Sequence, residues 1–228
     1  MNLFKFYFLI LLIIISANCC AQYKYPFQNP ALTYNERIEN LIQQLTIDEK
    51  INLLLYNNDG VSRLGIPKYN WWNEALHGVA RAGRATVFPQ AIGIAATFND
   101  DLIFRVADAI SDEARAKFNV AVKNNNRSQY LGLTFWSPNI NIFRDPRWGR
   151  GHETYGEDPY LTGHIGTAFV KGMQGDDPNY YKTLACAKHF AVHSGPEPLR
   201  HKFNAVVSES DLRNTYLPAS PFPDLIHK

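Results

Sequence analysis

Four short clusters in the sequence gather side chains that could hold or transform a ligand. They combine tryptophans, fixed cations, a carboxylate and imidazoles, and they read "WWNEALHG" (71–78), "RDPRWGRGHETYGED" (144–158), "AKHFAVHSG" (187–195) and "RHKF" (200–203). Arginine and lysine donate hydrogen bonds to hydroxyls, a carboxylate accepts from a pair of them, and tryptophan packs on an apolar ring face. This combination predicts a site for a neutral, polyhydroxylated ligand.

Other ligand chemistries have weaker support. A phosphate site would bring a cradle such as GxxxxGK[ST] and a zinc protease would bring HExxH, and the sequence contains neither. His189 and His193 have a metal-like spacing, but on an extended strand residues four apart lie roughly 13 Å apart, too far for one ion. We therefore expect no metal and no cofactor. A metal-dependent hydrolase that uses the histidines stays open as an alternative.

The balance of charge gives no reason to expect a nucleic-acid partner. The 228 residues include 23 Lys and Arg against 21 Asp and Glu, so no basic field is available. Aromatic residues make up 13% of the chain and charged residues 19%, a mixture that is typical of a folded globular protein.

The first 21 residues have the layout of a secretory signal peptide. A lysine is followed by an apolar run over residues 6–15, too short to span a bilayer, and then by small and polar residues. We expect export to the periplasm or the extracellular space, with residues 22–228 forming one domain. A lipoprotein-type anchor at Cys19 or Cys20 is the alternative. Cys186 would then be the only other cysteine, and we expect it to be a small buried side chain.

Helical and extended patterns alternate along the rest of the chain. Capping-box spacings at Thr33 and Thr46 predict two helices, the second running through Leu55. Further helices are expected after a cap at Asn99 or Asp100, from Asp158 to about Gly172, and, again with a cap at its start, in "SESDLRNTYLP" (208–218). Buried extended segments are expected at "ATVFPQAIGIAATF" (85–98), "LTFWSPNINIF" (133–143) and "TLACAKHFAV" (183–192).

This alternation predicts an α/β fold in which helices cover a parallel sheet. Ligand sites in such folds lie at the carboxyl ends of the strands. The segment 144–158 directly follows one predicted strand, so we expect it at that edge.

Longer stretches resemble a known family. "WWNEALHGVAR", "ATVFPQAIGIAATF", "FWSPNINIFRDPRWGRGHETYGEDPYLTG", "ACAKHFAVHSGPE" and "DLRNTYLPA" occur in the order and spacing of the amino-terminal domain of family 3 glycoside hydrolases, in its β-xylosidase and β-glucosidase members. The resemblance runs from Tyr34 to Pro218. It implies a (β/α)8 TIM-barrel-like domain, which takes about 250 residues, so we expect the barrel to be incomplete at its C-terminal end.

The resemblance also assigns roles to residues. Glu74 matches the carboxylate that accepts hydrogen bonds from the terminal sugar. The basic residues that bind the hydroxyls of that sugar correspond here to Arg150, Lys188 and His189. Further sugar contacts of xylosidase-like members fall on Trp136 and Arg200. Asp145 and Arg147 are expected to brace the loop that carries Arg150 and so support the site. The alternative is an ion pair with a purely structural role.

The family's chemistry implies an exo-acting, retaining β-glycosidase of plant polysaccharide breakdown. A retaining mechanism needs a nucleophilic carboxylate and a separate acid, and both are expected beyond residue 228. Asp224 lacks a preceding strand and is rejected as the nucleophile, so we assign no catalytic residue in this chain and expect negligible hydrolysis by it alone. A non-catalytic carbohydrate-binding fragment is the alternative, and the choice among xylose, glucose and arabinose stays open.

Overall fold

A computed structural model describes residues 23–79 and 81–219. The predicted signal peptide, with Cys19 and Cys20, and Asp224 lie outside the described residues. The chain divides into two compact units, residues 1–54 and 55–228. Within the described part, no helix is both long and apolar enough to cross a membrane.

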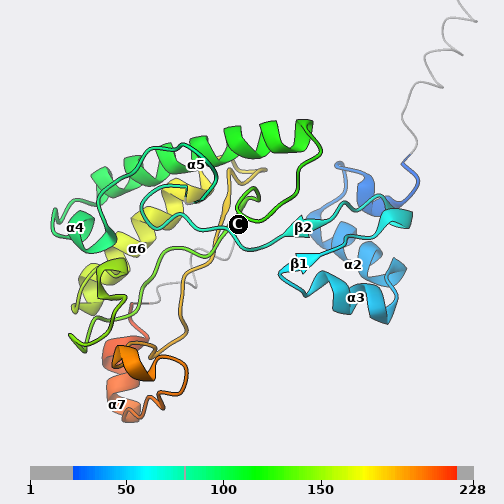
Figure 1. Cartoon of the computed structure of the whole chain (residues 1–228). Coiled ribbons are helices and arrows are strands. Elements are labelled where there is room, and N and C mark those ends of the chain that lie inside the picture. Colours follow the sequence, from blue (N-terminus) through cyan, green and yellow to red (C-terminus); the bar gives the residue numbers. More distant parts are fainter. Residues whose placement is uncertain (1–22, 80, 220–228) are drawn as a thin grey trace, which may run out of the picture. The chain divides into compact units, whose positions relative to one another are not determined.

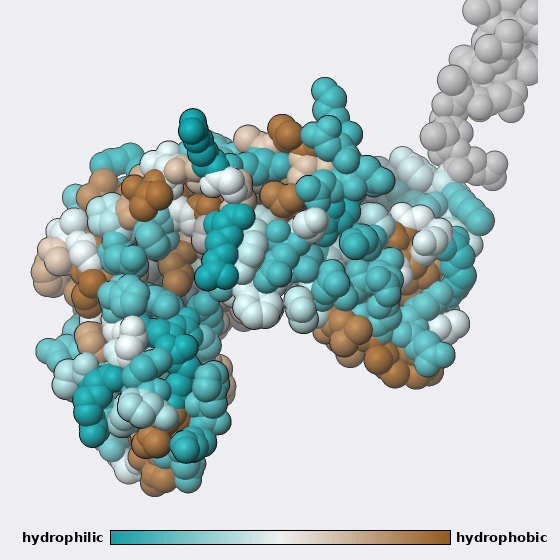
Figure 2. Space-filling model, viewed as in Figure 1, coloured by the Kyte–Doolittle hydropathy of each residue, from teal (hydrophilic) through white to brown (hydrophobic). Residues whose placement is uncertain are grey.

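The first unit is a short helical segment. Its elements are the 3-10 turn η1 (Pro26–Gln28), α2 (Tyr34–Gln44) and α3 (Ile47–Leu53). Both predicted capping boxes form, since Thr33 and Thr46 each accept from the backbone three residues on. The second helix ends at Leu53, short of the predicted Leu55. Several isoleucines of these helices, including Ile38 and Ile42, are exposed, and apolar surface is visible in Figure 2.

Three extended segments of the second unit run side by side in parallel. Strand β3 (Thr134–Phe135) pairs with β4 (Leu184–Ala185). Parallel bridges join Asn73 to Phe135 on one side and Asn139 to Lys188 further along. A separate antiparallel pair consists of β1 (Asn57–Asn58) and β2 (Tyr69–Asn70) (Figure 1). The predicted parallel pairing is therefore present, and the described residues form no closed barrel.

Two long helices pack against each other and supply most of the core (Figure 1). They are α5 (Asp100–Lys123), capped by Asn99, and α6 (Pro159–Gln174), capped by Asp158, as predicted. The buried side chains at their contact repeat at helical spacing and include Ile103, Ala107, Ile110, Ala114, Ile165, Phe169 and Met173. Gly172 permits the close approach, because a Cβ there would lie 2.4 Å from Phe104 O. Ser111 Oγ also donates to the Gly172 carbonyl oxygen at 3.0 Å.

The expectations for residues 85–98 and for Cys186 were wrong. Residues 85–98 were expected to form a buried strand and a turn, but they contain the helix α4 (Ala91–Ala95), whose Ala91, Ile94 and Ala95 are buried at helical spacing. Cys186 was expected to be buried and is exposed. Its backbone N–H donates to Phe135 O at 2.8 Å and so continues the pairing of β3 with β4, while its side chain is exposed.

The remaining elements are short. They are η2 (Ser62–Leu64), η3 (Gly151–Glu153), η4 (Glu197–Leu199), α7 (Glu209–Asp211) and the π-helical turn η5 (Leu212–Tyr216). The last two replace the single capped helix that was expected over residues 208–218. Ser208 caps their start as predicted.

We predict that Gly172→Ala destabilises the second unit. A Cβ at this position would lie 2.4 Å from Phe104 O and 2.7 Å from Ala107 Cβ, so α5 and α6 would have to separate. Overpacking of this kind costs about 1–3 kcal/mol, measurable as a lower free energy of unfolding in urea.

Gly93→Ala is the matched control. The nearest atom to a Cβ there, Pro89 Cβ, is at 3.9 Å, so the exchange should be neutral or stabilising. Equal unfolding curves for the two variants would contradict the role given to the close helix contact.

Candidate functional site

The site residues follow the three parallel segments at one edge. Glu74 comes directly after Asn73, and Trp136 directly after β3, where its N–H donates to Asn73 O at 2.8 Å. Lys188 lies three residues beyond β4, and its N–H donates to Pro138 O at 2.9 Å. The pairing that aligns the segments therefore also brings their chemistry-bearing side chains together.

Arg150 is delivered to this edge by the loop after β3. It precedes the turn η3, and its guanidinium grips Glu153 through two parallel bonds, Nε to Oε1 at 2.9 Å and Nη2 to Oε2 at 2.5 Å. The hydrogen bonds to Glu153 raise the pKa of Arg150, and the charges of Glu74 and Glu197 act in the same direction. Arg150 is thus a fixed, permanently charged donor.

Lys188 and Glu74 lie within electrostatic range of each other and of Arg150. Burial lowers the pKa of Lys188, and the carboxylates of Glu74 and Glu153 oppose that effect. Glu74 accepts a hydrogen bond from Trp72 Nε1 at 3.2 Å. The residues predicted to grip a ligand therefore converge, with Glu74 acting on both cations.

His189 completes the cluster as a neutral imidazole. Its Nε2 lies 3.4 Å from Arg150 Nη1, and its ring centroid lies 4.1 Å from that of His193. Burial, followed by the neighbouring His193 and the cations Arg150 and Lys188, lowers the pKa of His189 to about 3. The expected separation of roughly 13 Å between the two histidines was wrong, because the chain between them is not an extended strand. The described residues contain no group of three or more side chains suited to a metal ion.

An aromatic wall borders the charged residues. The rings of Trp72 and Trp136 lie 5.0 Å apart between centroids, inclined by 31°. Trp71 points elsewhere, since it packs on Tyr69 with a centroid distance of 5.0 Å and is exposed. The hydrogen bond from Trp72 to Glu74 ties this wall to the charged side chains.

The remaining predicted residues lie around the Arg150 loop. Arg200 forms an ion pair with Glu197, whose Oε2 accepts from Gly149 N at 3.0 Å. Asp145 and Arg147 pair at 2.8 Å, and hydrogen bonds from Arg147 lower the pKa of Asp145 to about 2. The Arg147 side chain is 72% exposed. These contacts fasten the loop to itself and to the segment that contains Arg200.

Sequence reasoning missed three polar residues that organise the site. Glu153 and Glu197 each pair with an arginine three positions away, a spacing that was readable in "RGHE" and "EPLR". Asn141 contacts His189 across 48 residues. Nothing local in "PNINIF" indicates that contact, which depends on the register of β3 and β4.

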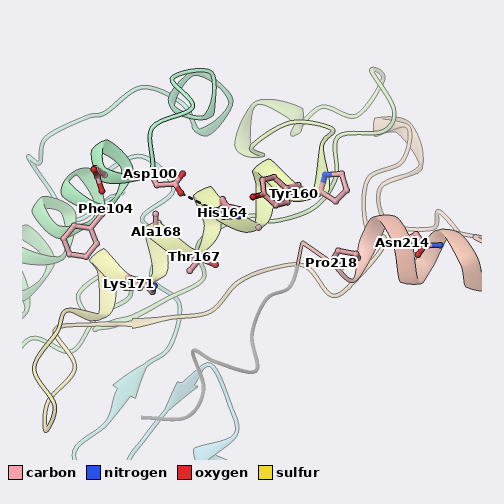
Figure 3. A pocket seen from close by; sticks show the side chains of 12 residues that line it. Asp100, Phe104, Tyr160, His164, Thr167, Ala168, Lys171, Asn214 and Pro218 are labelled. Carbon is pink, nitrogen blue, oxygen red and sulfur yellow. Dashed lines mark ion pairs between the residues drawn. The ribbon is translucent and has the colours of Figure 1, made fainter.

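A separate hollow of about 720 Å³ lies between α5, α6 and the chain around Pro218 (Figure 3). His164 and Asp100 approach each other there at 3.4 Å. The lining contains none of the predicted site residues, so this hollow is distinct from the cluster around Arg150.

Comparison with known proteins gives consistent similarities. A sequence model described as "Glycosyl hydrolase family 3 N terminal domain" matches residues 34–228. The chain is 50% identical over 216 residues to a xylan 1,4-beta-xylosidase of Xylanibacter ruminicola, covering 93% of this chain and 25% of that protein. It is 46% identical to beta-D-xylosidase 3 of Arabidopsis thaliana, covering 88% of this chain and 27% of that one.

Solved structures agree with these relatives. The GH3 exo-beta-xylosidase XlnD, in complex with a xylobiose aziridine probe, superposes with a TM-score of 0.75 at 34% identity, over 88% of this chain and 27% of that one. A GH3 beta-glucosidase of Bifidobacterium adolescentis superposes with a TM-score of 0.64 at 30% identity, covering 78% of this chain and 24% of that one. The chain spans about a quarter of the length of these relatives.

We predict that Glu153→Gln lowers stability in a pH-dependent way. Burial raises the pKa of Glu153, but the bonds and charge of Arg150 outweigh it, so the folded pKa lies below the ordinary value. The stabilisation is therefore present above the unfolded pKa of about 4.3 and is lost as pH falls through the folded pKa. At neutral pH the variant should lose about 1–3 kcal/mol of unfolding free energy.

Urea unfolding at several pH values tests this expectation, with exposed Glu157→Gln as the control. The two variants should differ at neutral pH and become similar in acid. A constant difference across the pH range would show that the ion pair is not its source.

Proposed function

The chain belongs to glycosyl hydrolase family 3 through its match to the N-terminal domain, and from this premise we propose that the cluster around Arg150 binds the terminal sugar of a β-glycoside. The convergence of Glu74, Arg150 and Lys188 is the observation that supports this proposal best. Each of these residues follows a different parallel segment. They are far apart in the sequence and come together only because the segments pair.

The donors and acceptors suit a ring with several hydroxyls. A hydroxyl donates one hydrogen bond and accepts others. Arg150 and Lys188 can donate to its oxygen, while Glu74 can accept its hydrogen. Trp136, packed on Trp72, adds an apolar surface beside them. A phosphate or carboxylate ligand would leave Glu74 facing a like charge.

Xylosides are the proposed first choice among substrates. Relatives named xylosidases are 50% and 46% identical, whereas the beta-glucosidase structure is 30% identical. Glucosides and arabinosides are the alternatives. In the longer architecture of these relatives, the site would serve an exo-acting, retaining β-glycosidase of plant polysaccharides. The pattern of residues 1–21 supports export of that protein to the periplasm or beyond the cell.

We assign neither catalytic carboxylate to the described residues. A retaining enzyme needs a nucleophile and a proton-carrying acid. Glu153 is committed to Arg150, and its lowered pKa is the opposite of what an acid requires. Glu74 is placed to accept from hydroxyls. A non-catalytic sugar-binding role, which needs only the cluster itself, is the second candidate.

Calorimetry with xylose and glucose tests the binding proposal. Glu74→Gln and Lys188→Met should each weaken binding by about tenfold, on the order of 1.4 kcal/mol, because each removes a charge-assisted bond. Lys171→Met, at an exposed position of α6, is the control and should bind like the parent. A folded parent chain without measurable affinity for either sugar would refute the proposal.

Turnover separates the two candidate roles. We expect the chain alone to release negligible aryl alcohol from aryl β-xylosides and β-glucosides, because we assign no nucleophile among the described residues. Hydrolysis that is abolished by Glu74→Ala or Arg150→Ala would overturn this expectation, and would place the complete chemistry within these 228 residues.

A further inference from the structure

Asn141 clamps the segment that contains His189. The side chain is 2% exposed and makes hydrogen bonds on both of its ends. Its Oδ1 accepts from His189 N at 3.0 Å and lies 2.8 Å from His189 Nδ1. Its Nδ2 donates to His189 O at 2.7 Å and to Ala191 O at 3.0 Å.

The backbone contacts decide which way this amide faces. The carbonyl oxygens of His189 and Ala191 can only accept, so the NH2 group must lie toward them. The backbone N–H of His189 can only donate, so the amide oxygen must lie toward it. The orientation of the Asn141 amide is therefore settled by backbone groups and is independent of any choice made for the imidazole.

That orientation determines the tautomer of His189. The atom facing Nδ1 is an acceptor, so Nδ1 must carry the hydrogen, and in a neutral ring Nε2 then keeps its lone pair. Nε2 in turn faces Arg150 Nη1 at 3.4 Å, and a guanidinium can only donate. The contacts of both ring nitrogens are therefore consistent with the same neutral tautomer, which has its hydrogen on Nδ1.

We infer that Asn141 is a positioning residue, which holds His189 in the neutral, Nδ1-protonated form so that Nε2 keeps its lone pair. A bound sugar hydroxyl would take the place of the 3.4 Å contact with Arg150 Nη1 and donate its hydrogen to Nε2. The sugar part of this inference rests on the proposed function. It gives the site a second acceptor beside Glu74. A sugar hydroxyl bound by His189 would donate its hydrogen to Nε2, while the hydroxyl oxygen could accept a hydrogen bond from Arg150 or Lys188.

The surrounding charges favour the same form. Beside burial, His193, Arg150 and Lys188 disfavour the imidazolium, whereas the carboxylate of Glu153 favours it. An aspartate at position 141 would add a carboxylate in contact with Nδ1 and stabilise the charged ring. The neutral amide keeps the acceptor without that charge.

Nitrogen-resolved NMR of the histidine rings in the whole chain tests the inference without any sugar. The His189 signals, identified by their loss in His189→Gln, should show a protonated Nδ1 and an unprotonated Nε2. They should not titrate between about pH 5 and about pH 8. An imidazolium at neutral pH, or a hydrogen on Nε2, would overturn the inference even if Asn141→Asp does not fold.

Asn141→Asp supplies the second arm. It should raise the pKa of His189 into the range between about pH 5 and about pH 8, so that xylose binding weakens about tenfold from the upper to the lower pH. Asn139→Asp is the matched control. Asn139 is also buried; its Oδ1 accepts from the backbone N–H of Asn141 at 3.1 Å, which an aspartate can retain, and its Nδ2 has no hydrogen-bond partner among the described residues. The exchange therefore adds the same charge without a hydrogen bond to the ring. Equal effects in both variants would contradict a contact-specific role.

Sugar titration of the parent chain separates this inference from the proposed function. A shift of the Nε2 signal on binding supports the acceptor role. Binding that leaves Nε2 unmoved overturns that role alone. If no sugar binds but Nδ1 is protonated, the proposed function and the acceptor role are both overturned. The inference that Asn141 fixes the tautomer of His189 is then still supported.

Discussion

The parallel pairing of three extended segments is the constraint on which the site depends. Bridges at Asn73–Phe135 and Asn139–Lys188 set a common direction and register. Because parallel strands end at the same edge, Glu74, Trp136 and Lys188 arrive together although they are far apart in sequence. A slip of one residue would turn each side chain to the opposite face. The register therefore matters more to the cluster than any single polar contact within it.

Charge balance explains how this edge can be partly buried. Isolated ions lose much of their hydration energy on burial, and only close partners compensate for it. Arg150 has Glu153 in a two-bond pair, and Lys188 lies near both Glu74 and Glu153. The neutral ring of His189 adds polarity without a further positive charge. The cluster thus offers fixed donors and acceptors while its own charges are nearly compensated.

Much of this arrangement was readable in the sequence, and the exceptions have physical causes. Caps at Thr33, Thr46, Asp158 and Ser208 depend on neighbouring residues and were predicted correctly, and Asn99 is one of the two caps predicted for α5. The segment 85–98 was misjudged because a short apolar run suits a buried strand and a buried helix equally. The contact of Asn141 with His189 could not be predicted, because it forms only once distant segments are in register. The motifs indicated the residues that converge at this edge, but not the residues that orient them.

The two-bond pair between Arg150 and Glu153, residues three apart on one tight turn, also fixes the plane of the guanidinium. A lysine could supply the same charge but would remain free to rotate, whereas a locked planar fork donates only along set directions. Equatorial hydroxyls radiate outward near the mean plane of a pyranose, and axial ones stand across it. A donor that cannot turn would therefore distinguish epimers by angle, so stereochemical selectivity would begin in the stiffness of a single loop.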